Sequence, residues 1–421
     1  MAHLRGHPLY VPLPHPCAVR VRSLADVARF RQDSWQWDAL HAGRVTGSCA
    51  AACLGLLEPS AAREIGIPPQ MAGSHKAAAA AARLRARGTL RTLEQMRQLE
   101  EGACEAAAAA AAGVCLLPTD GCDDVWAWAL GVPGGCPFAA EHTPPRGMRP
   151  PPGAERRWAR NVGQVRMAWG TAQEPVGLLA ALNFFGTCER FEGARLEECG
   201  CMCGEALADN TAPGGGAAGA AAAGVEGGVA VGVAGGVVGG VAVGPPLVGA
   251  SPDGLMRFPD GHTEIVEVKC HAPFAASRGG GGGGGGSGFN LHDRGPYSDV
   301  GPWHVPQLML EVYCAGPSCT AANLLSLSAT RGVIVHRVPR DDAWIECMLA
   351  LFGRFHAEWC TDSPGGSSAP PPDFWHHDEQ AAWLRRRTRK VAAEAEIVAK
   401  IENDLVQRGS IASWGPLFFD D

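Results

Sequence analysis

The hydrophobic and polar positions of this chain repeat with a helical period in some segments and with a strand period in others. Helical spacing predicts helices at 24–40, 162–185, 305–314 and 341–359. Short apolar or alternating runs predict strands at 254–258, 264–270, 323–328 and 332–338. Pro259-Asp260-Gly261 is a turn sequence, so the first two strands should form a hairpin. This succession indicates an α/β (α+β) fold, with a central mixed sheet flanked by helices.

Low-complexity Gly/Ala insertions interrupt this pattern. Alanine and glycine repeats lie at 77–82, 106–112, 213–244 and 279–286. Such tracts cannot build a packed core, and alanine inflates the hydrophobic content of 46%. We therefore expect one elaborated domain rather than two. Its parts are an N-terminal extension at 1–34, the domain at 35–348, insertions near 72–145, 205–246 and 275–300, and a helical, partly basic tail at 349–421.

Charge and cysteine content narrow the possible partners. The formal net charge is −7, so any contact with nucleic acid requires local positive charge. The basic run at 385–390 either follows phosphates or is the solvated face of a helix. Cys199, Cys201 and Cys203 resemble a soft-metal site, but no second Cys/His pair stands at zinc-finger spacing. Free thiols in a reducing, intracellular compartment are the expectation.

No segment has the pattern of a membrane span, so we expect a soluble protein with no membrane contact. The apolar stretch at 227–244 is saturated with glycine and is a poor helix former. The first 25 residues hold arginines and no acidic residue, which leaves an organellar transit peptide open, although their prolines argue against an amphipathic helix. The sequence does not indicate whether the protein is located in an organelle or in the nucleus.

The predicted hairpin carries the residues with the clearest chemistry. Strand alternation places Glu267 and Lys269 on one face with Ile265, and Val266 and Val268 on the other. Asp253 begins the preceding strand, and pairing across the turn can bring it close to Glu267. Two carboxylates are suitable ligands for Mg²⁺, which lowers the pKa of bound water. An exposed hairpin with an ion pair is the alternative.

Five segments, taken in order, resemble the YqaJ viral recombinase family, which comprises nucleases related to phage lambda exonuclease in the PD-(D/E)XK superfamily. These segments are 37–48, 167–174, 249–255, 267–270 and 305–311. The resemblance implies a restriction-endonuclease-like core. It also implies that Glu174, Asp253 and Glu267 hold the metal, as two Mg²⁺ or Mn²⁺ ions in the family pattern, while Lys269 assists the attacking water and Gln307 supports the site.

The same resemblance implies a grip on a terminal 5′-phosphate by Ser48 and Ser251, with Arg44 nearby, since hydroxyl and guanidinium groups suit phosphate. Two positions depart from the family pattern. Pro175 follows Glu174, so the helix should kink or a new segment should begin there. His41 stands where the family has an arginine.

These motifs favour a metal-dependent deoxyribonuclease, acting 5′ to 3′ as an exonuclease on double-stranded DNA ends in recombination or repair, with a homotrimer as the expected assembly. A structure-specific endonuclease, a catalytically inactive DNA-binding or scaffold protein, and an RNA substrate stay open. Two further groups have weaker patterns. Trp126 and Trp128 either stack on bases or pack locally. The histidines around the core motif either serve as zinc ligands or a general base, or have no such role, because their spacing is irregular and mostly in loops; they are His262, His271, His292 and His304.

Overall fold

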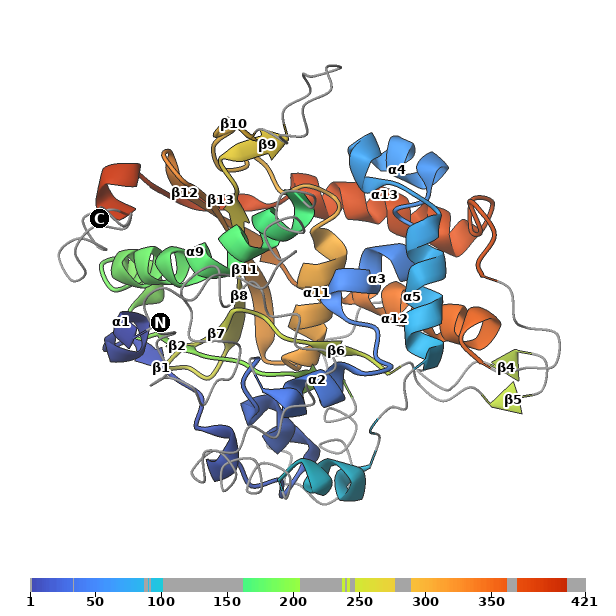
Figure 1. The fold of residues 1–421 in the computed structure, drawn as a ribbon, viewed down its shortest axis with the longest axis horizontal. Coiled ribbons are helices and arrows are strands. Elements are labelled where there is room, and N and C mark those ends of the chain that lie inside the picture. Colours follow the sequence, from blue (N-terminus) through green and yellow to red (C-terminus); the bar gives the residue numbers. More distant parts are fainter. Residues whose placement is uncertain are drawn as a thin grey trace, which may run out of the picture.

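A seven-stranded mixed sheet forms the centre of the protein (Figure 1). The computed structural model describes residues 2–32, 34–86, 90, 92–100, 162–204, 237–238, 241–242, 247–276, 289–361 and 369–406. The strand order is β1 (Tyr10–Val11), β2 (Arg195–Glu197), β7 (Gly254–Arg257), β8 (Thr263–His271), β11 (Cys319–Ser328), β12 (Gly332–Pro339) and β13 (Glu396–Ile401). The β1–β2 and β8–β11 pairs are parallel and the other pairs antiparallel. The prediction of a mixed sheet is confirmed.

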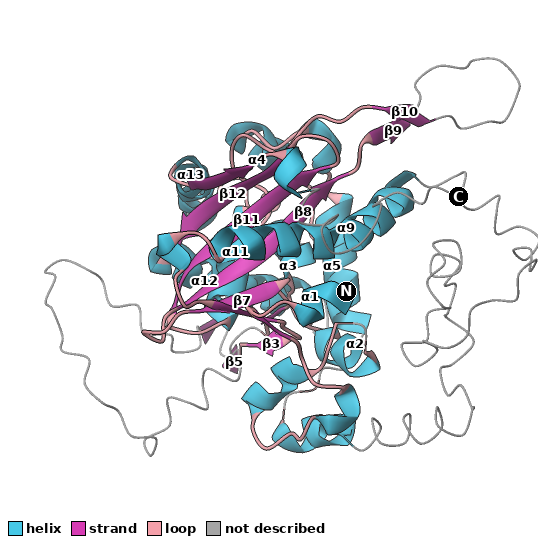
Figure 2. Ribbon diagram, turned by 90° about the vertical axis from the view of Figure 1, so that its left-hand side faces the viewer, coloured by secondary structure: helices cyan, strands magenta, loops and turns pink. Residues whose placement is uncertain are grey.

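Helices cover both faces of this sheet (Figure 2). The described helices are α1 (Ala2–Gly6), α2 (Trp35–His41), α3 (Gly47–Cys53), α4 (Pro59–Ile65), α5 (His75–Ala86), α9 (Val162–Phe185), α11 (Val305–Cys314), α12 (Asp342–Trp359) and α13 (Glu379–Ala393). Short strand pairs are β3 (Met202–Cys203) with β6 (Gly249–Ala250), β4 (Val237–Val238) with β5 (Val241–Ala242), and β9 (Phe274–Ala276) with β10 (Phe289–Leu291).

The alternation of β8 separates two hydrophobic cores. Ile265 is fully buried in the core that includes α11, α3 and α12. Val266 and Val268 pack in a second core with Leu178 of α9. Gly177 permits the close approach of α9, because a Cβ there would lie 2.8 Å from Val268 Cγ1. The predicted faces of β8 are therefore confirmed, and Glu267 lies on the α11 side.

Three predicted helices have the expected positions, and one divides. The helix predicted at 24–40 is a 3-10 helix at Leu24–Arg29 followed by α2. The break has a local cause, because the Ser34 hydroxyl accepts a hydrogen bond from Trp37 N at 3.3 Å and starts a new helix. Thr46 is the N-cap of α3. α9 continues through Pro175 as one helix, so no new segment begins there.

The predicted domain boundaries at 34 and 348 need correction. Position 348 lies inside α12, and β13 pairs with β12 in the central sheet. Trp344 of α12 is fully buried and donates through Nε1 to Thr388 Oγ1 of α13 at 2.9 Å. At the other end, β1 belongs to the same sheet. The expected extension and tail are thus parts of one core, because long-range pairing and packing recruit them.

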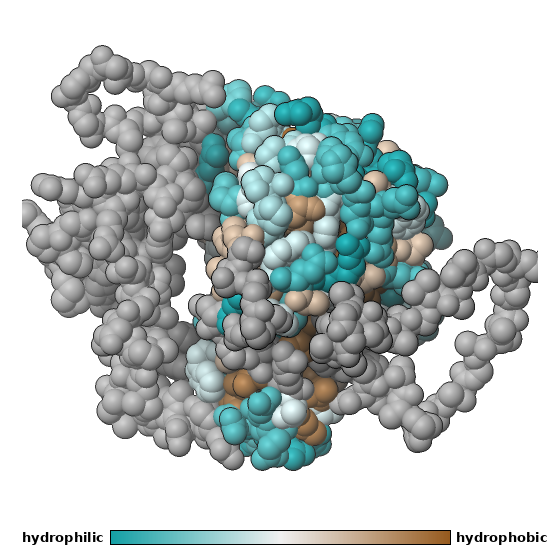
Figure 3. All heavy atoms as spheres, turned by 90° about the vertical axis from the view of Figure 1, so that its right-hand side faces the viewer, coloured by the Kyte–Doolittle hydropathy of each residue, from teal (hydrophilic) through white to brown (hydrophobic). Residues whose placement is uncertain are grey.

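The basic run at 385–390 is largely engaged in the fold. Arg385 is buried and binds Glu64 at 2.6 Å, Arg387 binds Asp341 at 2.5 Å, and Lys390 is 3.5 Å from Glu394. The face that carries α4, α5 and α13 is hydrophilic over most of its described surface (Figure 3). Among helices in the described ranges, none combines the length and apolarity needed to cross a bilayer.

Candidate active site

Backbone pairing brings two separate sequence motifs together. Val45 N donates to Leu247 O at 2.9 Å, and Gly249 N donates to Val45 O at 3.0 Å. The segment 43–48 therefore lies beside the strand that leads into Ser251. Gln32 Nε2 also donates to the carbonyls of Ser251 and Pro252, at 3.3 and 3.2 Å, and holds this turn in place.

Asp253 is anchored to β8 by a backbone hydrogen bond. Its Oδ2 accepts from Val268 N at 2.6 Å, while the neighbouring Gly254 pairs with Val266. Because Val268 is the residue between Glu267 and Lys269, this bond holds the Asp253 carboxylate next to these two residues. The predicted proximity across the hairpin is confirmed.

Glu267 lies at the centre of the cluster and is only 4% exposed. Its Oε1 accepts from Lys269 Nζ at 2.5 Å and from Gln307 Nε2 at 2.6 Å. Within the described part of the chain, its buried Oε2 has no hydrogen-bond partner. A buried carboxylate oxygen without a donor is costly, so this atom is available to a cation or a proton.

Glu311 is a site residue to which the sequence analysis assigned no role. It is 1% exposed, and its Oε1 accepts from Gln307 Nε2 at 2.8 Å. The signal was present in the spacing, because Gln307 and Glu311 are four residues apart and share one face of α11. Gln307 thus links two buried carboxylates.

The buried carboxylates repel one another. Burial, and then Glu267, raise the pKa of Glu174 to about 7. The same two causes raise the pKa values of Asp253 and Glu311. Burial alone would lower the pKa of Lys269, but Glu267 outweighs it and keeps the ammonium charged. Carboxylates from α9, the turn before β7, β8 and α11 therefore influence one another's charge, and Lys269 contacts Glu267 directly.

The donor set fits a hard divalent cation by its chemistry, since all of these ligands are carboxylate oxygens and Glu267 Oε2 has no donor. The arrangement is not a preformed metal centre: within the described ranges, no three His, Cys, Asp or Glu side chains are placed to hold an ion. Lys269 and Gln307 occupy Glu267 Oε1. Binding a cation would require the Glu267 contacts to rearrange.

The three predicted phosphate-binding residues have different surroundings. Ser251 Oγ lies 2.8 Å from Trp37 Nε1 and 2.9 Å from His41 Nε2. Ser48 is exposed at the start of α3, and its hydroxyl is 3.1 Å from Thr46 Oγ1. Burial, then nearby arginines, lower the pKa of His41 to about 4, so its ring is neutral at pH 7.

Arg44 does not fit the predicted role. It is fully buried, and its guanidinium donates to the carbonyls of Leu40 and Leu90, each at 2.5 Å. A buried side chain engaged with backbone cannot also bind an external phosphate. The exposed cation at this end is Arg83 of α5, whose Nη2 lies 3.0 Å from Thr46 Oγ1. Sequence reasoning missed Arg83 because its alanine-rich segment was treated as an insertion.

The remaining histidines and cysteines have structural surroundings. His262 binds Asp260 in the β7–β8 turn, His271 binds Ser326, and His292 is exposed. His304 is the N-cap of α11, and burial, then Lys269, lower its pKa to about 3. The cysteines predicted as a possible soft-metal site are buried, and burial raises the pKa of Cys199 and contributes to that of Cys201. Trp126 and Trp128 lie outside the described residues.

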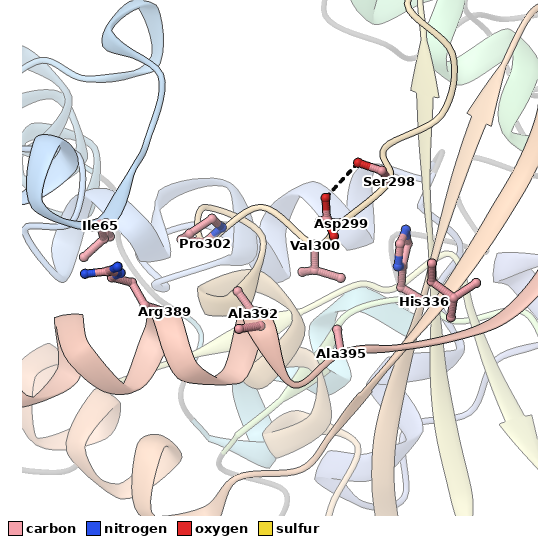
Figure 4. A pocket seen from close by; sticks show the side chains of 11 residues that line it. Ile65, Ser298, Asp299, Val300, Pro302, His336, Arg389, Ala392 and Ala395 are labelled. Carbon is pink, nitrogen blue, oxygen red and sulfur yellow. Dashed lines mark hydrogen bonds between the residues drawn. The ribbon is translucent and has the colours of Figure 1, made fainter.

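A pocket of about 320 Å³ lies elsewhere in the molecule (Figure 4). It is lined by α13, the loop before α11, the end of α4 and part of β12, including Arg389, Ala392, Asp299, Val300, Ile65 and His336. None of the predicted site residues lines it. The carboxylate cluster therefore remains the candidate active site.

No family model, curated protein or solved structure matches the chain. The resemblance to the YqaJ family therefore rests on the motifs and stays a prediction.

Protonation of Glu174 should make stability depend on pH. Because its pKa rises from 4.5 to about 7 in the fold, the folded state binds this proton more readily. The stability from this group is full below the unfolded pKa and is lost as the pH rises through about 7. Thermal unfolding between about pH 5 and 8 should show a steeper fall in Tm for the wild type than for Glu174→Gln. Identical profiles would contradict this prediction.

Proposed function

We propose that this chain is a metal-dependent deoxyribonuclease that hydrolyses phosphodiester bonds in DNA. The observation that carries the proposal is the buried Glu267 carboxylate, which Lys269 and Gln307 contact at Oε1 and whose Oε2 has no hydrogen-bond partner among the described residues, with Asp253 anchored next to it on Val268 N. These carboxylates would repel a DNA phosphate by themselves, so the proposal requires a cation. Buried charges of this kind are costly as pure structure, which favours a functional reason for them.

Glu174, Asp253 and Glu267 would hold Mg²⁺ or Mn²⁺, with two ions expected from the family. A bound ion supplies an activated water and neutralises charge on the phosphate. Gln307 fixes Glu267 by its hydrogen bond. Lys269, which contacts Glu267 Oε1, would donate a hydrogen bond to a phosphate oxygen and neutralise charge that develops there.

Ser251 would provide a contact to the phosphate. In the neutral His41 tautomer with a proton on Nε2, both Trp37 and His41 donate to Ser251 Oγ. The Ser251 hydroxyl proton is then directed to a third partner. A phosphate oxygen is a suitable acceptor, and exposed Ser48 would provide a second donor at the start of α3.

The proposal of a restriction-endonuclease-like core rests on the motif resemblance and on the order of the elements. The order of elements begins with the helix α9 and the antiparallel strands β2, β7 and β8. It continues with the helix α11 and then β11, which is parallel to β8. This order supports the restriction-endonuclease-like core. Action 5′ to 3′ on duplex ends, a role in recombination or repair, a homotrimer and an intracellular location remain predictions from the sequence.

Purified protein should degrade linear duplex DNA in Mg²⁺ or Mn²⁺, lose this activity in EDTA, and leave covalently closed circles intact. Cleavage of closed circles would favour the endonuclease alternative. An equal rate on RNA would change the substrate class. Failure to cut any of these substrates with either ion would refute the nuclease proposal.

A catalytically inactive DNA-binding protein is the second candidate. The observation in its favour is that Glu267 is already engaged by Lys269 and Gln307, without a preformed metal centre in the described ranges. Isothermal titration with Mn²⁺ separates the two candidates. An enzyme should bind Mn²⁺ through Asp253, whereas DNA binding with neither Mn²⁺ binding nor cleavage would favour the inactive protein.

Gly47→Ala should reduce cleavage because it displaces Gln307. A Cβ at Gly47 would lie 2.8 Å from Gln307 Cγ, so the Gln307 side chain must shift, and the shift should disturb its hydrogen bond to Glu267. We expect a loss of about tenfold or more in kcat, with the fold retained. Gly6→Ala is the matched control, since its Cβ would meet no atom within 4 Å. Equal kcat values for both variants would remove Gln307 from the proposed site.

A further inference from the structure

The sulfur of Cys49, on α3, is surrounded by hydrogen-bond donors. Arg83 Nη2 lies 3.0 Å from Cys49 Sγ, and Thr46 N lies 3.4 Å from it. The Cys53 thiol donates to the same sulfur from the end of the helix. An N–H of a guanidinium, a backbone N–H and an S–H all require an acceptor, so the contacts suit a thiolate at Cys49.

Cys49 and Cys53 have opposite protonation preferences. The hydrogen bond from Cys53 is the main cause that lowers the pKa of Cys49 to about 6; burial opposes it and Arg83 reinforces it. Burial, and then Cys49, raise the pKa of Cys53. At pH 7 the pair therefore consists of one thiolate and one thiol, which is the combination that thiol oxidation requires.

We propose that Cys49 is a site of oxidative modification, at which a hydroperoxide oxidises its thiolate and Cys53 closes a disulfide. In the first step the Cys49 thiolate attacks one oxygen of the hydroperoxide. The O–O bond breaks, a sulfenic acid forms, and the other oxygen leaves as hydroxide or alkoxide. In the second step the Cys53 sulfur attacks the Cys49 sulfur, the S–O bond breaks, and water leaves with the Cys53 proton.

The position of the pair permits both steps. Residues four apart in a helix have Cα atoms about 6 Å apart, within the range of disulfides. Cys53 is the last residue of α3, so only the final turn must adjust. Cys49 is 7% exposed, and the side chain that contacts its sulfur, Arg83, is exposed. A small hydroperoxide therefore has a short path once Arg83 moves.

Mass spectrometry of the full chain tests this proposal. The native protein is treated with hydrogen peroxide at pH 7, and peptide masses are followed with time. Cys347 is the matched control within the same molecule, because it is 8% exposed while burial and Asp378 raise its pKa to about 12. We expect the Cys49–Cys53 disulfide to form well before Cys347 is modified.

Two variants test whether the thiolate state of Cys49, rather than the exposure of its sulfur, controls the rate of oxidation. Arg83→Gln should slow oxidation of Cys49 by about twofold at pH 7, since a rise of one pKa unit from about 6 lowers the thiolate fraction from about nine tenths to one half. Cys53→Ser should stop the reaction at the sulfenic acid, which dimedone captures at Cys49. Equal rates for Cys49 and Cys347, no slowing in Arg83→Gln, or no reaction of Cys49 in the native protein would each overturn the proposal.

Discussion

Asp253→Asn is expected to lower the rate of DNA cleavage by about a thousandfold or more and to leave the fold intact. Asparagine has nearly the same shape, and its oxygen can still accept from Val268 N. It has no charge with which to hold a cation. Burial and the nearby Glu267 already disfavour the charge of Asp253, so its removal should not lower the free energy of unfolding.

Asp260→Asn is the matched control for this prediction. Asp260 lies in the turn between β7 and β8, and its carboxylate is largely exposed and binds His262. Cleavage by this variant should equal that of the wild type, and thermal unfolding should show that both variants are folded. Full activity in Asp253→Asn would show that Asp253 has no catalytic role and would contradict the nuclease proposal.

Arg44→Ala is expected to destabilise the protein by about 2–4 kcal/mol, whatever its effect on DNA binding. The substitution removes the hydrogen bonds to the carbonyls of Leu40 and Leu90 and leaves a space where a fully buried side chain was. A residue that only gripped a phosphate would lower affinity and leave stability unchanged. Urea unfolding therefore discriminates between the two roles of Arg44.

Arg22→Ala serves as the comparison, because Arg22 is exposed. Its free energy of unfolding should match the wild type within about 0.5 kcal/mol. Wild-type stability in Arg44→Ala, together with weaker binding of DNA ends, would restore the phosphate role that the sequence suggested. Activity should be compared per folded molecule, at a temperature where both variants are native.

Local patterns in the sequence were sufficient for much of the fold. Two-residue alternation along β8 predicts which side chains share a face, because the strand geometry allows no other arrangement. The helix at 305–314 has the predicted bounds. Asp253 and Glu267 come together because only a short hairpin separates them.

Contacts between distant segments were not predictable in the same way. Arg44 and Arg83 are both arginines near Thr46 in space, and nothing in their local sequence indicates that one is buried while the other is exposed. Glu311 was assigned no role because its importance depends on α11 packing beside β8. The C-terminal helices were set apart as a tail since some of their partners, such as Glu64 for Arg385, lie hundreds of residues earlier in the chain.

β13 has a further consequence for handling this protein in solution. Its backbone pairs with β12, and Gly332, at φ +81°, brings the two strands so close that a Cβ there would lie 2.0 Å from Ile401 O. A chain shortened before residue 396 would leave the apolar β12 as an open edge, which can pair with another copy and form aggregates. Glu396 and Lys400 of β13 discourage such pairing in the intact protein. β13 therefore covers the edge of β12 and prevents self-association through that edge.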